Sequence, residues 1–401
     1  MNIFVVNSGS SSIKYQLFRM PSEQPLCSGL VERIGLEEGS ITHKVYKDGE
    51  EKVIKKNAPI ANHEVGLLEV KNLLCEPGIG VIQNPEEIDA VGHRVVHGGE
   101  RFATTTIITP EIKEKIKELF PLAPLHNPAN YLGIEVAERI FTNALQVAVF
   151  DTAFHQTMPE VAYRYAIPNE LYTEKKIRAY GFHGTSHKYV TQKAIEYLGN
   201  EDAKLVTIHL GNGSSMAAVD KGRSVDTTMG LGPMGGLIMG TRSGDIDPSI
   251  IFHLIKEGYT AEEVNKLLNK QSGMLGLTGY SDMRDVLKAI SEGDKKAKLA
   301  YDMYAYRIKK YIGSYAAVLN GLDAIVFTAG IGENDNLIRE KACTNMEFLG
   351  LELDTRKNNE RSKGLREINK EGSAVKILVI PTNEELEIVR QCFELLAEVN
   401  V

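Results

Sequence analysis

The sequence predicts a mixed α/β protein made of two related halves, and three observations support this prediction. Short apolar runs rich in β-branched residues alternate along the chain with well-marked helices. A strand, a Gly/Ser tip and a second strand at residues 3–18 recur near residue 208. The chain of 401 residues is long enough for two domains with separate cores. We therefore expect a duplicated α/β architecture with one Gly/Ser hairpin in each half.

The predicted strands are apolar runs bounded by turn residues. A weaker alternation near Ile41–Tyr46 lies within a charged, turn-rich stretch from Met20 to Pro85, which we interpret as scaffold without chemistry. The strands are predicted at Ile3–Val6, Ile13–Phe18, Ile88–Val96, Leu145–Phe150, Leu205–Leu210, Met216–Val219, Ala324–Thr328 and Val375–Ile380.

Capping signals mark the predicted helices. A long helix from Lys298 to Leu319 carries a stripe of tyrosines, which is either a dimer surface or, as is more common at helical spacing, part of a core. These tyrosines are Tyr301, Tyr304, Tyr311 and Tyr315. Other helix starts are predicted at Asn127-Pro128, at Asp247-Pro248 in a helix that ends at Gly258, and at Thr260, which forms a capping box with Glu263.

Composition and charge limit the partners that we expect. The net charge of −7 and the pI near 5.9 argue against nucleic acid or an anionic membrane, because binding phosphate backbones needs a basic surface. No basic region precedes the first strand at Ile3, and no apolar stretch approaches the length of a membrane span, so neither secretion nor membrane insertion is expected. Widely spaced cysteines predict reduced, buried thiols in a cytosolic protein, at Cys27, Cys75, Cys343 and Cys392.

The repeated hairpin carries the first functional signal. Gly9-Ser10-Ser11 is matched by Gly213-Ser214-Ser215, 204 positions later. A tight Gly/Ser turn offers backbone N–H and hydroxyl groups that bind phosphate oxygens. A single turn of this kind is more often a plain hairpin, but two in matched positions favour phosphate binding.

A third glycine-rich stretch follows the strand predicted at Ala324–Thr328. It reads Gly330-Ile331-Gly332-Glu333-Asn334 and precedes a helical pattern. Glycines at a strand-to-helix turn let the backbone approach a nucleotide closely, although an ordinary turn explains the stretch equally well. The full GxGxxG motif is absent, and no GxxxxGK[ST] occurs, which excludes a P-loop.

Seven of the ten histidines lie between His93 and His209, which raises the question of a zinc site. The stretch around His93 and His97 reads as a strand, and no HExxH motif, cysteine or neighbouring carboxylate completes a zinc site, so zinc is not favoured. On that strand Arg94 and Val96 share the opposite face. A guanidinium beside a branched apolar residue suits a short organic carboxylate, whereas an isolated arginine would more simply form a surface salt bridge.

Four further polar positions have both plain and functional interpretations. Asp151 ends a buried strand, where α/β enzymes hold ligands, but an aspartate also caps turns there. His183 precedes a helix that Thr185 or Ser186 could cap, and Arg242 stands between small residues. Glu384 lies at a strand-to-helix junction, where acids also complement the helix dipole. Together, these side chains and the glycine turns are the groups that phosphoryl transfer requires.

Two long motifs carry a resemblance to a known family. The strings VVNSGSSSIKYQL at 5–17 and YGFHGTSHKYV at 180–190 are similar to the signatures of the acetate kinase family, within the superfamily of sugar kinases, chaperone ATPases and actin. The similarity runs from end to end of the chain. It implies two ribonuclease-H-like (actin-like ATPase) domains with an active site in the cleft between them. We expect domains at 1–150 plus 383–401 and at 151–382, in a cytoplasmic homodimer.

The resemblance also implies an activity and roles for individual residues. The reaction would be reversible transfer of the γ-phosphoryl group of ATP to acetate, giving acetyl phosphate and ADP. Propionate or butyrate kinase is the alternative within the family, and an actin- or chaperone-like ATPase module is the alternative from another class. Asp151 would be catalytic and would act through Mg²⁺ or its waters, His183 and Arg242 would stabilise the transition state, and His126 would lie at the phosphoryl group.

The remaining implied roles concern ligand binding. Asn7 and Glu384 would bind Mg²⁺, for which Mn²⁺ could substitute, and Lys14 would lie by the nucleotide phosphates. Arg94 would hold acetate, whose methyl pocket would be lined by Val96, Leu125, Phe182 and Pro233. ATP would contact His209, Leu210, Gly211, Asn212, Gly213, Asp282, Met283, Arg284, Gly330, Ile331, Gly332, Glu333 and Asn334.

Overall fold

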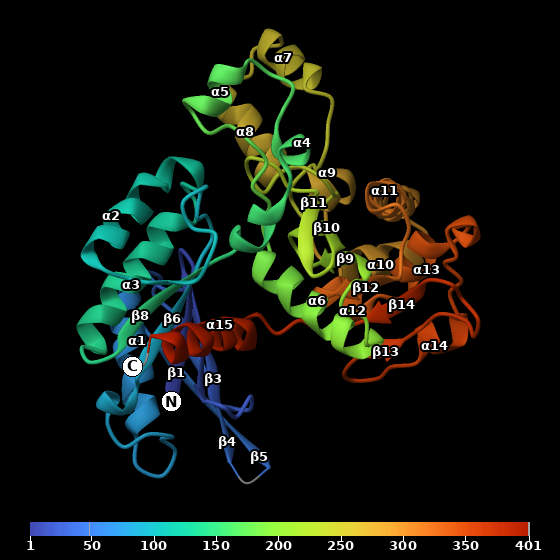
Figure 1. The fold of residues 1–401 in the computed structure, drawn as a ribbon. Coiled ribbons are helices and arrows are strands. Elements are labelled where there is room, and N and C mark those ends of the chain that lie inside the picture. Colours follow the sequence, from blue (N-terminus) through green and yellow to red (C-terminus); the bar gives the residue numbers. More distant parts are fainter. Residues whose placement is uncertain (48, 400–401) are drawn as a thin grey trace. The chain divides into compact units, whose positions relative to one another are not determined.

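The computed structural model describes residues 1–47 and 49–399 (Figure 1). The chain forms two compact units, Met1–Ala153 with Asn383–Val401 and Phe154–Thr382. The sequence analysis predicts the first boundary after residue 150, and the first unit instead continues to Ala153. The predicted return of the chain to the first unit at residue 383 agrees with Asn383.

Each unit is built on one mixed sheet. The strands are β1 Asn2–Ser8, β2 Ser12–Arg19, β3 Pro25–Glu32, β4 Gly39–Lys47, β5 Glu50–Ala58, β6 Ala90–Val95, β7 Thr106–Ile107, β8 Leu145–Phe150, β9 Lys204–Leu210, β10 Ser214–Asp220, β11 Arg223–Thr227, β12 Ala324–Thr328, β13 Arg366–Glu367 and β14 Lys376–Val379.

Helices cover both sheets. They are α1 His63–Cys75, α2 Pro110–Glu118, α3 Asn127–Ile140, α4 Glu160–Tyr163, α5 Asn169–Thr173, α6 Gly184–Leu198, α7 Ser249–Lys256, α8 Ala261–Lys270, α9 Gly273–Thr278, α10 Met283–Ser291, α11 Lys295–Leu319, α12 Ala329–Asn334, α13 Asn336–Cys343, α14 Thr355–Asn359 and α15 Glu384–Glu398. Short 3₁₀ turns lie at Pro85–Glu87, Phe120–Leu122, Ala153–Thr157 and Glu347–Leu349.

The two sheets share one topology. Their strand orders are β5-β4-β3-β2-β1-β6-β8-β7 and β11-β10-β9-β12-β14-β13. Each sheet contains three consecutive antiparallel strands, β1 to β3 in the first and β9 to β11 in the second. Two further strands run parallel to β1 or β9, namely β6 and β8 or β12 and β14. A two-residue strand, β7 or β13, then pairs antiparallel with β8 or β14 at the edge. The β4–β5 hairpin is an addition to the first sheet. The predicted duplication is therefore confirmed in the strand order.

The two Gly/Ser hairpins exist, but their alignment differs from the predicted one. The first strands start at Asn2 and Lys204, and the second strands start at Ser12 and Ser214, so equivalent positions differ by 202 residues rather than 204. Gly9 is thus equivalent to Gly211. Repeated glycines and serines allow either alignment by sequence alone, and the 202-residue alignment rests on where the strands start. The pairs nearest the tips are Ser8 with Ile13 and Leu210 with Ser214, so the second hairpin is one residue shorter.

Each sheet is covered in part by a helix that follows, in the chain, the last long strand of the other sheet. Helix α6 follows β8 in the chain and packs against β9 and β12 of the second unit. Helix α15 follows β14 and packs against β1, β6 and β8 of the first unit. This exchange explains why residues after Asn383 return to the first unit, and it brings the start of α15 to the ends of the first unit's strands.

Several local predictions are wrong in detail. The stretch from Met20 to Pro85 contains three long strands, β3 to β5, and helix α1, of which only the alternation near Ile41–Tyr46, within β4, was predicted. Strand β6 ends at Val95, so the alternation predicted through His97 stops earlier. Strand β11 was not predicted, because its five residues carry no apolar run. The capping box of Thr260 with Glu263 is confirmed.

The tyrosine stripe of α11 belongs to a core. Tyr301, Tyr304 and Tyr315 are each at most 2% exposed, and they pack in the main apolar cluster of the second unit. The α11 stripe is therefore not a dimer surface. Three of the four cysteines are buried and all four are free thiols. In the part of the chain that the structure describes, no helix combines the length and apolar character needed to cross a membrane.

Candidate active site

The first unit gathers polar side chains at the carboxyl ends of its central parallel strands. Asn7 of β1 and Arg94 of β6 each come one position beyond the paired residues Val6 and His93. Asp151 directly follows β8, and its N–H donates to the carbonyl of Val95 at 3.0 Å. The carboxyl ends of parallel strands are the edge at which α/β proteins hold ligands.

The first turn of α15 adds two carboxylates to this edge. Arg94 forms an ion pair with Asp151 through Nη2, and its Nε lies 3.9 Å from Oε2 of Glu384. Nζ of Lys14 lies 2.6 Å from Oε1 of Glu385. Lys14, expected near nucleotide phosphates, is thus paired with a carboxylate and half-exposed. Two cations and three carboxylates meet here, which leaves an excess of negative charge.

The pKa values follow this charge balance. Burial raises the pKa of Glu384 to about 7, with Asp151 and Glu385 acting in the same direction and Arg94 opposing it. Burial by itself would lower the pKa of Arg94, but Asp151 and Glu384 together raise it above its ordinary value. The Arg94 guanidinium therefore stays charged, while Glu384 lacks full charge compensation.

These residues fit a magnesium ion. Among the described residues, no three histidine, cysteine or acidic side chains are grouped so that they could hold a metal alone. Magnesium does not need such a group, because it usually keeps several waters and binds one or two carboxylates together with substrate phosphates. The excess carboxylate charge at Glu384 and the nearby amide of Asn7 supply oxygen ligands of this kind.

Two asparagines that the sequence analysis did not assign to the site position these strand ends. Asn130 accepts from the N–H of Val96 at 3.1 Å and donates to the carbonyl of Ser8 at 2.8 Å. Asn127 accepts from the N–H of His97 at 3.0 Å and donates to its carbonyl at 3.0 Å. Asn127 therefore does not cap α3 as predicted. The paired asparagines three residues apart, next to Pro128, are the only sequence signal for this role.

The other first-unit positions are distributed around α3. Val96 is buried just beyond the end of β6, and His126 is the residue that precedes α3. Leu125 exposes 62% of its surface. His93 is a core residue, since its Nε2 lies 2.7 Å from Oε1 of Gln146 and burial lowers its pKa to about 4.

In the second unit, two predicted catalytic residues meet at a hairpin tip. The tip between β9 and β10 runs from Gly211 to Gly213. A Cβ atom at Gly213 would lie 3.4 Å from Nε2 of His183 and 3.6 Å from Nη1 of Arg242. Both side chains therefore lie directly beside the glycine. Because the tip presents bare backbone here, a phosphate could approach both side chains at once.

His183 is held by the strand that follows the tip. Its backbone is left-handed, with φ 57°, and it ends the chain segment before α6. Its Nδ1 lies 2.9 Å from Oγ of Ser215, and its ring stacks on His209 with centroids 4.2 Å apart. Thr185 and Ser186 lie inside α6 and do not cap it, contrary to the prediction. The Nδ1 contact leaves Nε2 directed to the tip.

Ser215 has a different role from the predicted one. It lies in β10 rather than at the tip, and its Oγ also lies 2.7 Å from Nε2 of His187. Burial, together with two neighbouring histidines, lowers the pKa of His187 well below its ordinary value, so this ring is neutral. The Ser215 hydroxyl thus lies between the rings of His183 and the neutral His187.

Arg242 is a partly buried cation beside a predicted substrate residue. Its Nη1 donates to the carbonyl of Pro233 at 2.9 Å. Burial lowers its pKa, and no carboxylate pairs with it among the described residues. A buried guanidinium without a counter-charge is stabilised when an anion binds next to it.

A pocket of about 770 Å³ brings together three of the predicted nucleotide segments. Gly211 and Asn212 come from the hairpin tip, residues 282–284 from the start of α10, and Gly330, Ile331 and Asn334 from α12. Leu287 and Ile331 add apolar surface for a base. The volume lies in the range of small-molecule sites.

Two details of this pocket differ from the expectation. The glycines at 330 and 332 lie within the helix α12 rather than in an extended loop, so the strand-to-helix turn is tighter than predicted. Asp282 caps α10 and pairs with Arg284, which lowers its pKa to about 2. His209 and Leu210 end β9, and Glu333 accepts from the N–H of Thr382 at 3.1 Å.

Two units with one strand order, a Gly-rich hairpin in each and a nucleotide-sized pocket define the actin-like ATPase class of fold. A family model described as the acetokinase family matches residues 2–390. The chain belongs to the acetokinase family.

Relatives and solved structures agree with this family. The chain is 60% identical over 397 residues to the acetate kinase of Flavobacterium johnsoniae, covering 99% of this chain and 100% of the relative. It is 53% identical over 401 residues to that of Oleidesulfovibrio alaskensis, with 99% and 100% covered.

Two solved structures match the fold over nearly the whole chain. The acetate kinase of Porphyromonas gingivalis is 45% identical with a TM-score of 0.92, covering 98% of this chain and 99% of that one. A propionate kinase from Francisella tularensis is 43% identical with a TM-score of 0.89, covering 97% and 98%.

Proposed function

We propose that the protein is an acetate kinase that transfers the γ-phosphoryl group of ATP to acetate, reversibly, giving acetyl phosphate and ADP. The observation that carries the proposal is the meeting of His183 and Arg242 at Gly213, on a hairpin whose other tip residues line the 770 Å³ pocket. A nucleotide with its base in that pocket would extend its phosphates toward these two side chains. The family and the names of the relatives support the same activity.

The chemistry requires positioning and charge neutralisation more than proton transfer. A carboxylic acid such as acetic acid is already ionised at neutral pH, so no base is needed to create the nucleophile. One acetate oxygen attacks the γ-phosphorus while the bond from that phosphorus to the β,γ-bridging oxygen breaks, and ADP leaves with the electron pair. His183 and Arg242 stabilise charge on the transferring phosphoryl oxygens.

The first unit would bind the acceptor. Arg94 offers a charged guanidinium to acetate, and Asp151 positions it through the ion pair. Val96 is buried and lies two residues after Arg94 in the chain, and it supplies apolar contact for the methyl group. Asn7 and Glu384 would hold Mg²⁺, which neutralises phosphate charge when it is bound. We propose that these groups and those of the second unit serve the same reaction.

The direct test is trapping of the product with hydroxylamine. The protein is incubated with MgATP, acetate and hydroxylamine, and acetohydroxamate is measured. We expect hydroxamate formation that depends on acetate and ATP. The matched control is Arg242→Gln, which removes the cation and should lose most of the rate. ATP hydrolysis without hydroxamate would instead favour an ATPase module whose output is domain motion.

A propionate kinase is the second candidate, because one solved relative carries that name. One methylene in an apolar pocket is worth only about 1–3 kcal/mol, so activity on propionate is expected as well. The ratio of kcat/KM for acetate to that for propionate decides between the two functions. A ratio below one would assign the protein as a propionate kinase.

We further propose a cytoplasmic homodimer. Helix α7 supports the dimer, because five of its eight residues are large and apolar while none of the eight is buried. Such a helix is stabilised when a second surface covers it. It replaces the tyrosine stripe of α11 as the candidate interface.

A further inference from the structure

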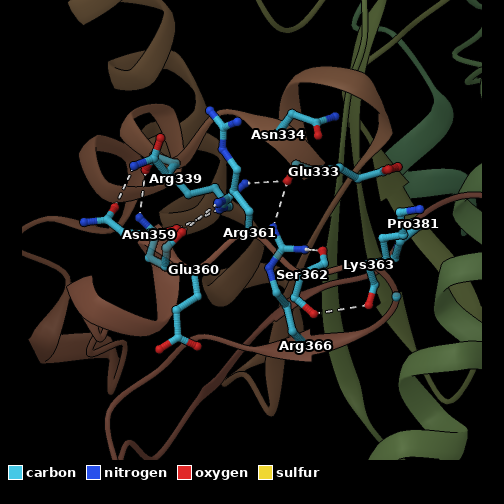
Figure 2. Close-up of a pocket in the computed structure, with 13 residues that line it drawn as sticks. Glu333, Asn334, Arg339, Asn359, Glu360, Arg361, Ser362, Lys363, Arg366 and Pro381 are labelled. Carbon is cyan, nitrogen blue, oxygen red and sulfur yellow. Dashed lines mark hydrogen bonds between the residues drawn. The ribbon is translucent and has the colours of Figure 1, made fainter.

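A second pocket adjoins the proposed nucleotide pocket (Figure 2). Its volume is about 920 Å³, and it lies among α12, α13, α14 and the loop at residues 360–364. The two pockets share three lining residues, Asn334, Asn336 and Arg361. A ligand in the second pocket would therefore be a neighbour of a bound nucleotide.

The charge of this pocket is mainly positive. Four of its side chains are cationic and two are carboxylates, of which Glu333 acts electrostatically on Arg366. Oε1 of Glu333 accepts from the N–H of Thr382, and Oε1 of Glu360 lies 3.9 Å from Arg356, which does not line the pocket. Figure 2 shows the Glu360 carboxylate pointing away from the guanidinium groups.

Two arginines form the rigid part of the site. Arg339 is 1% exposed and donates from Nη1 to the carbonyls of Gly332 and Glu333. Arg366 donates to the carbonyls of Glu333 and Ser362, while its Nε is buried without a hydrogen-bond partner among the described residues. Burial and the neighbouring Arg366 lower the pKa of Arg339 to about 10. Asp335 acts on Arg339 and Glu333 acts on Arg366, but neither arginine forms an ion pair among the described residues.

Two further cations are available for a ligand. Arg361 and Lys363 lie in the loop that borders the pocket, and both are exposed. Within residues 1–47 and 49–399, neither side chain has a hydrogen-bond or ion-pair partner. Side chains of this kind can turn toward an anion without breaking an existing contact.

We propose that this pocket binds a phosphate group of two or more negative charges, beside the nucleotide. Arg361 and Lys363 supply the mobile contacts, and Arg339 and Arg366 supply the fixed positive field. The ligand is either a free inorganic phosphate or pyrophosphate, or a phosphate carried on the ribose of a nucleotide. The position of this anion next to a nucleotide rests on the proposed function, whereas anion binding itself can be tested without ATP.

The test is calorimetric titration of the full chain with pyrophosphate in the absence of nucleotide. Lys363→Ala removes one mobile contact, and Lys370→Ala removes one exposed lysine of the same unit that lines neither pocket. We expect saturable binding that Lys363→Ala weakens about tenfold, as for the loss of one charge-assisted hydrogen bond, and that Lys370→Ala leaves unchanged.

A second titration distinguishes the two sources of the phosphate. Adenosine 3′,5′-bisphosphate is compared with 5′-AMP in the same proteins. If the bisphosphate binds more tightly than 5′-AMP and Lys363→Ala abolishes this difference in affinity, the phosphate belongs to a nucleotide. If pyrophosphate binds but the two nucleotides have equal affinity, the ligand is a free anion. Phosphate binding that Lys363→Ala leaves unchanged in both titrations overturns the proposal, and so does the absence of saturable binding. Hydroxamate formation is independent of either result.

Discussion

Nε of Arg94 lies 3.9 Å from Oε2 of Glu384, although the two residues are separated by most of the chain. Helix α15 makes this approach, because it follows the last strand of the second sheet and packs on the first. The same guanidinium pairs with Asp151. One arginine therefore faces two carboxylates, and burial, with the charge of Asp151 added to it, raises the pKa of Glu384 into the neutral range.

The pH dependence of magnesium binding should follow Glu384. Because burial raises its pKa to about 7, a proton competes with the metal below that pH. We expect the Mg²⁺ concentration for half-maximal rate to rise as the pH falls from about 8 to about 6. Initial rates over a magnesium series at each pH measure this. In Glu384→Gln the requirement should be higher and independent of pH over that range; an unchanged pH dependence would assign the titration to another group.

The sign of the stability effect of Glu384 is opposite to that of an ordinary paired carboxylate. Its pKa in the folded state lies above the ordinary value of 4.5. The folded protein therefore binds a proton that the unfolded chain has released, and the stabilisation is present below about pH 4.5 and lost as the pH rises to about 7. Urea unfolding of wild type and Glu384→Gln across this range should show a steeper fall for the wild type. Parallel curves would contradict the assigned shift.

Arg94→Ala should weaken acetate binding. It removes a charge-assisted contact to a carboxylate, which is worth about 1.5–3 kcal/mol, so the KM for acetate should rise about tenfold to a hundredfold. Arg94→Lys keeps the charge but loses the fork geometry and should recover part of this loss. Steady-state rates over an acetate series at saturating MgATP measure both variants. A normal acetate KM in Arg94→Ala would place the acceptor site elsewhere.

His183→Ala and Arg242→Ala should act mainly on kcat. Charge develops on the phosphoryl oxygens only as the bonds rearrange, so loss of either group should lower kcat about a hundredfold or more with a smaller effect on the acetate KM. Ser215→Ala serves as the positioning control, because it keeps the His183 ring and removes the 2.9 Å contact to its Nδ1 together with the 2.7 Å contact to His187. It should lower kcat less than His183→Ala does. Effects confined to KM in all three variants would argue against transition-state stabilisation.

Asn130→Ala should destabilise the first unit. The asparagine is 5% exposed and satisfies the N–H of Val96 and the carbonyl of Ser8. Leaving two buried backbone groups without partners should lower the free energy of unfolding by about 2–4 kcal/mol. Urea denaturation measures the loss. Asn130→Asp keeps the acceptor for Val96 and should lose less; equal stability of Asn130→Ala and wild type would show that water replaces the amide.

Phe252→Glu should disrupt the proposed dimer. Phe252 exposes 64% of its surface on α7, a helix without a buried residue. Sedimentation velocity should give a dimer for the wild type and a monomer for the variant. Tyr306→Glu, which changes an exposed residue of α11 instead, is the matched control and should remain dimeric. A monomeric wild type would refute the homodimer itself.

The sequence by itself determined the α/β class, the duplication and the chemical character of the site. Strand periodicity and capping are local properties, so β9, β12 and the capping box of Thr260 could be predicted. His183 lies within one of the two family motifs, whereas Arg94 and Arg242 lie outside both motifs and took their expected roles from the resemblance over the whole chain.

Only the tertiary structure decided what surrounds these residues. The 202-residue alignment of the hairpins depends on where their strands start, which repeated glycines and serines leave open. The contacts of Asn130 with Val96 and of Ser215 with His183 and His187 join residues that are distant in the chain, and no periodicity encodes them. The raised pKa of Glu384 and the lowered pKa of Arg339 have the same origin, because burial and neighbouring charges arise only when the chain has folded.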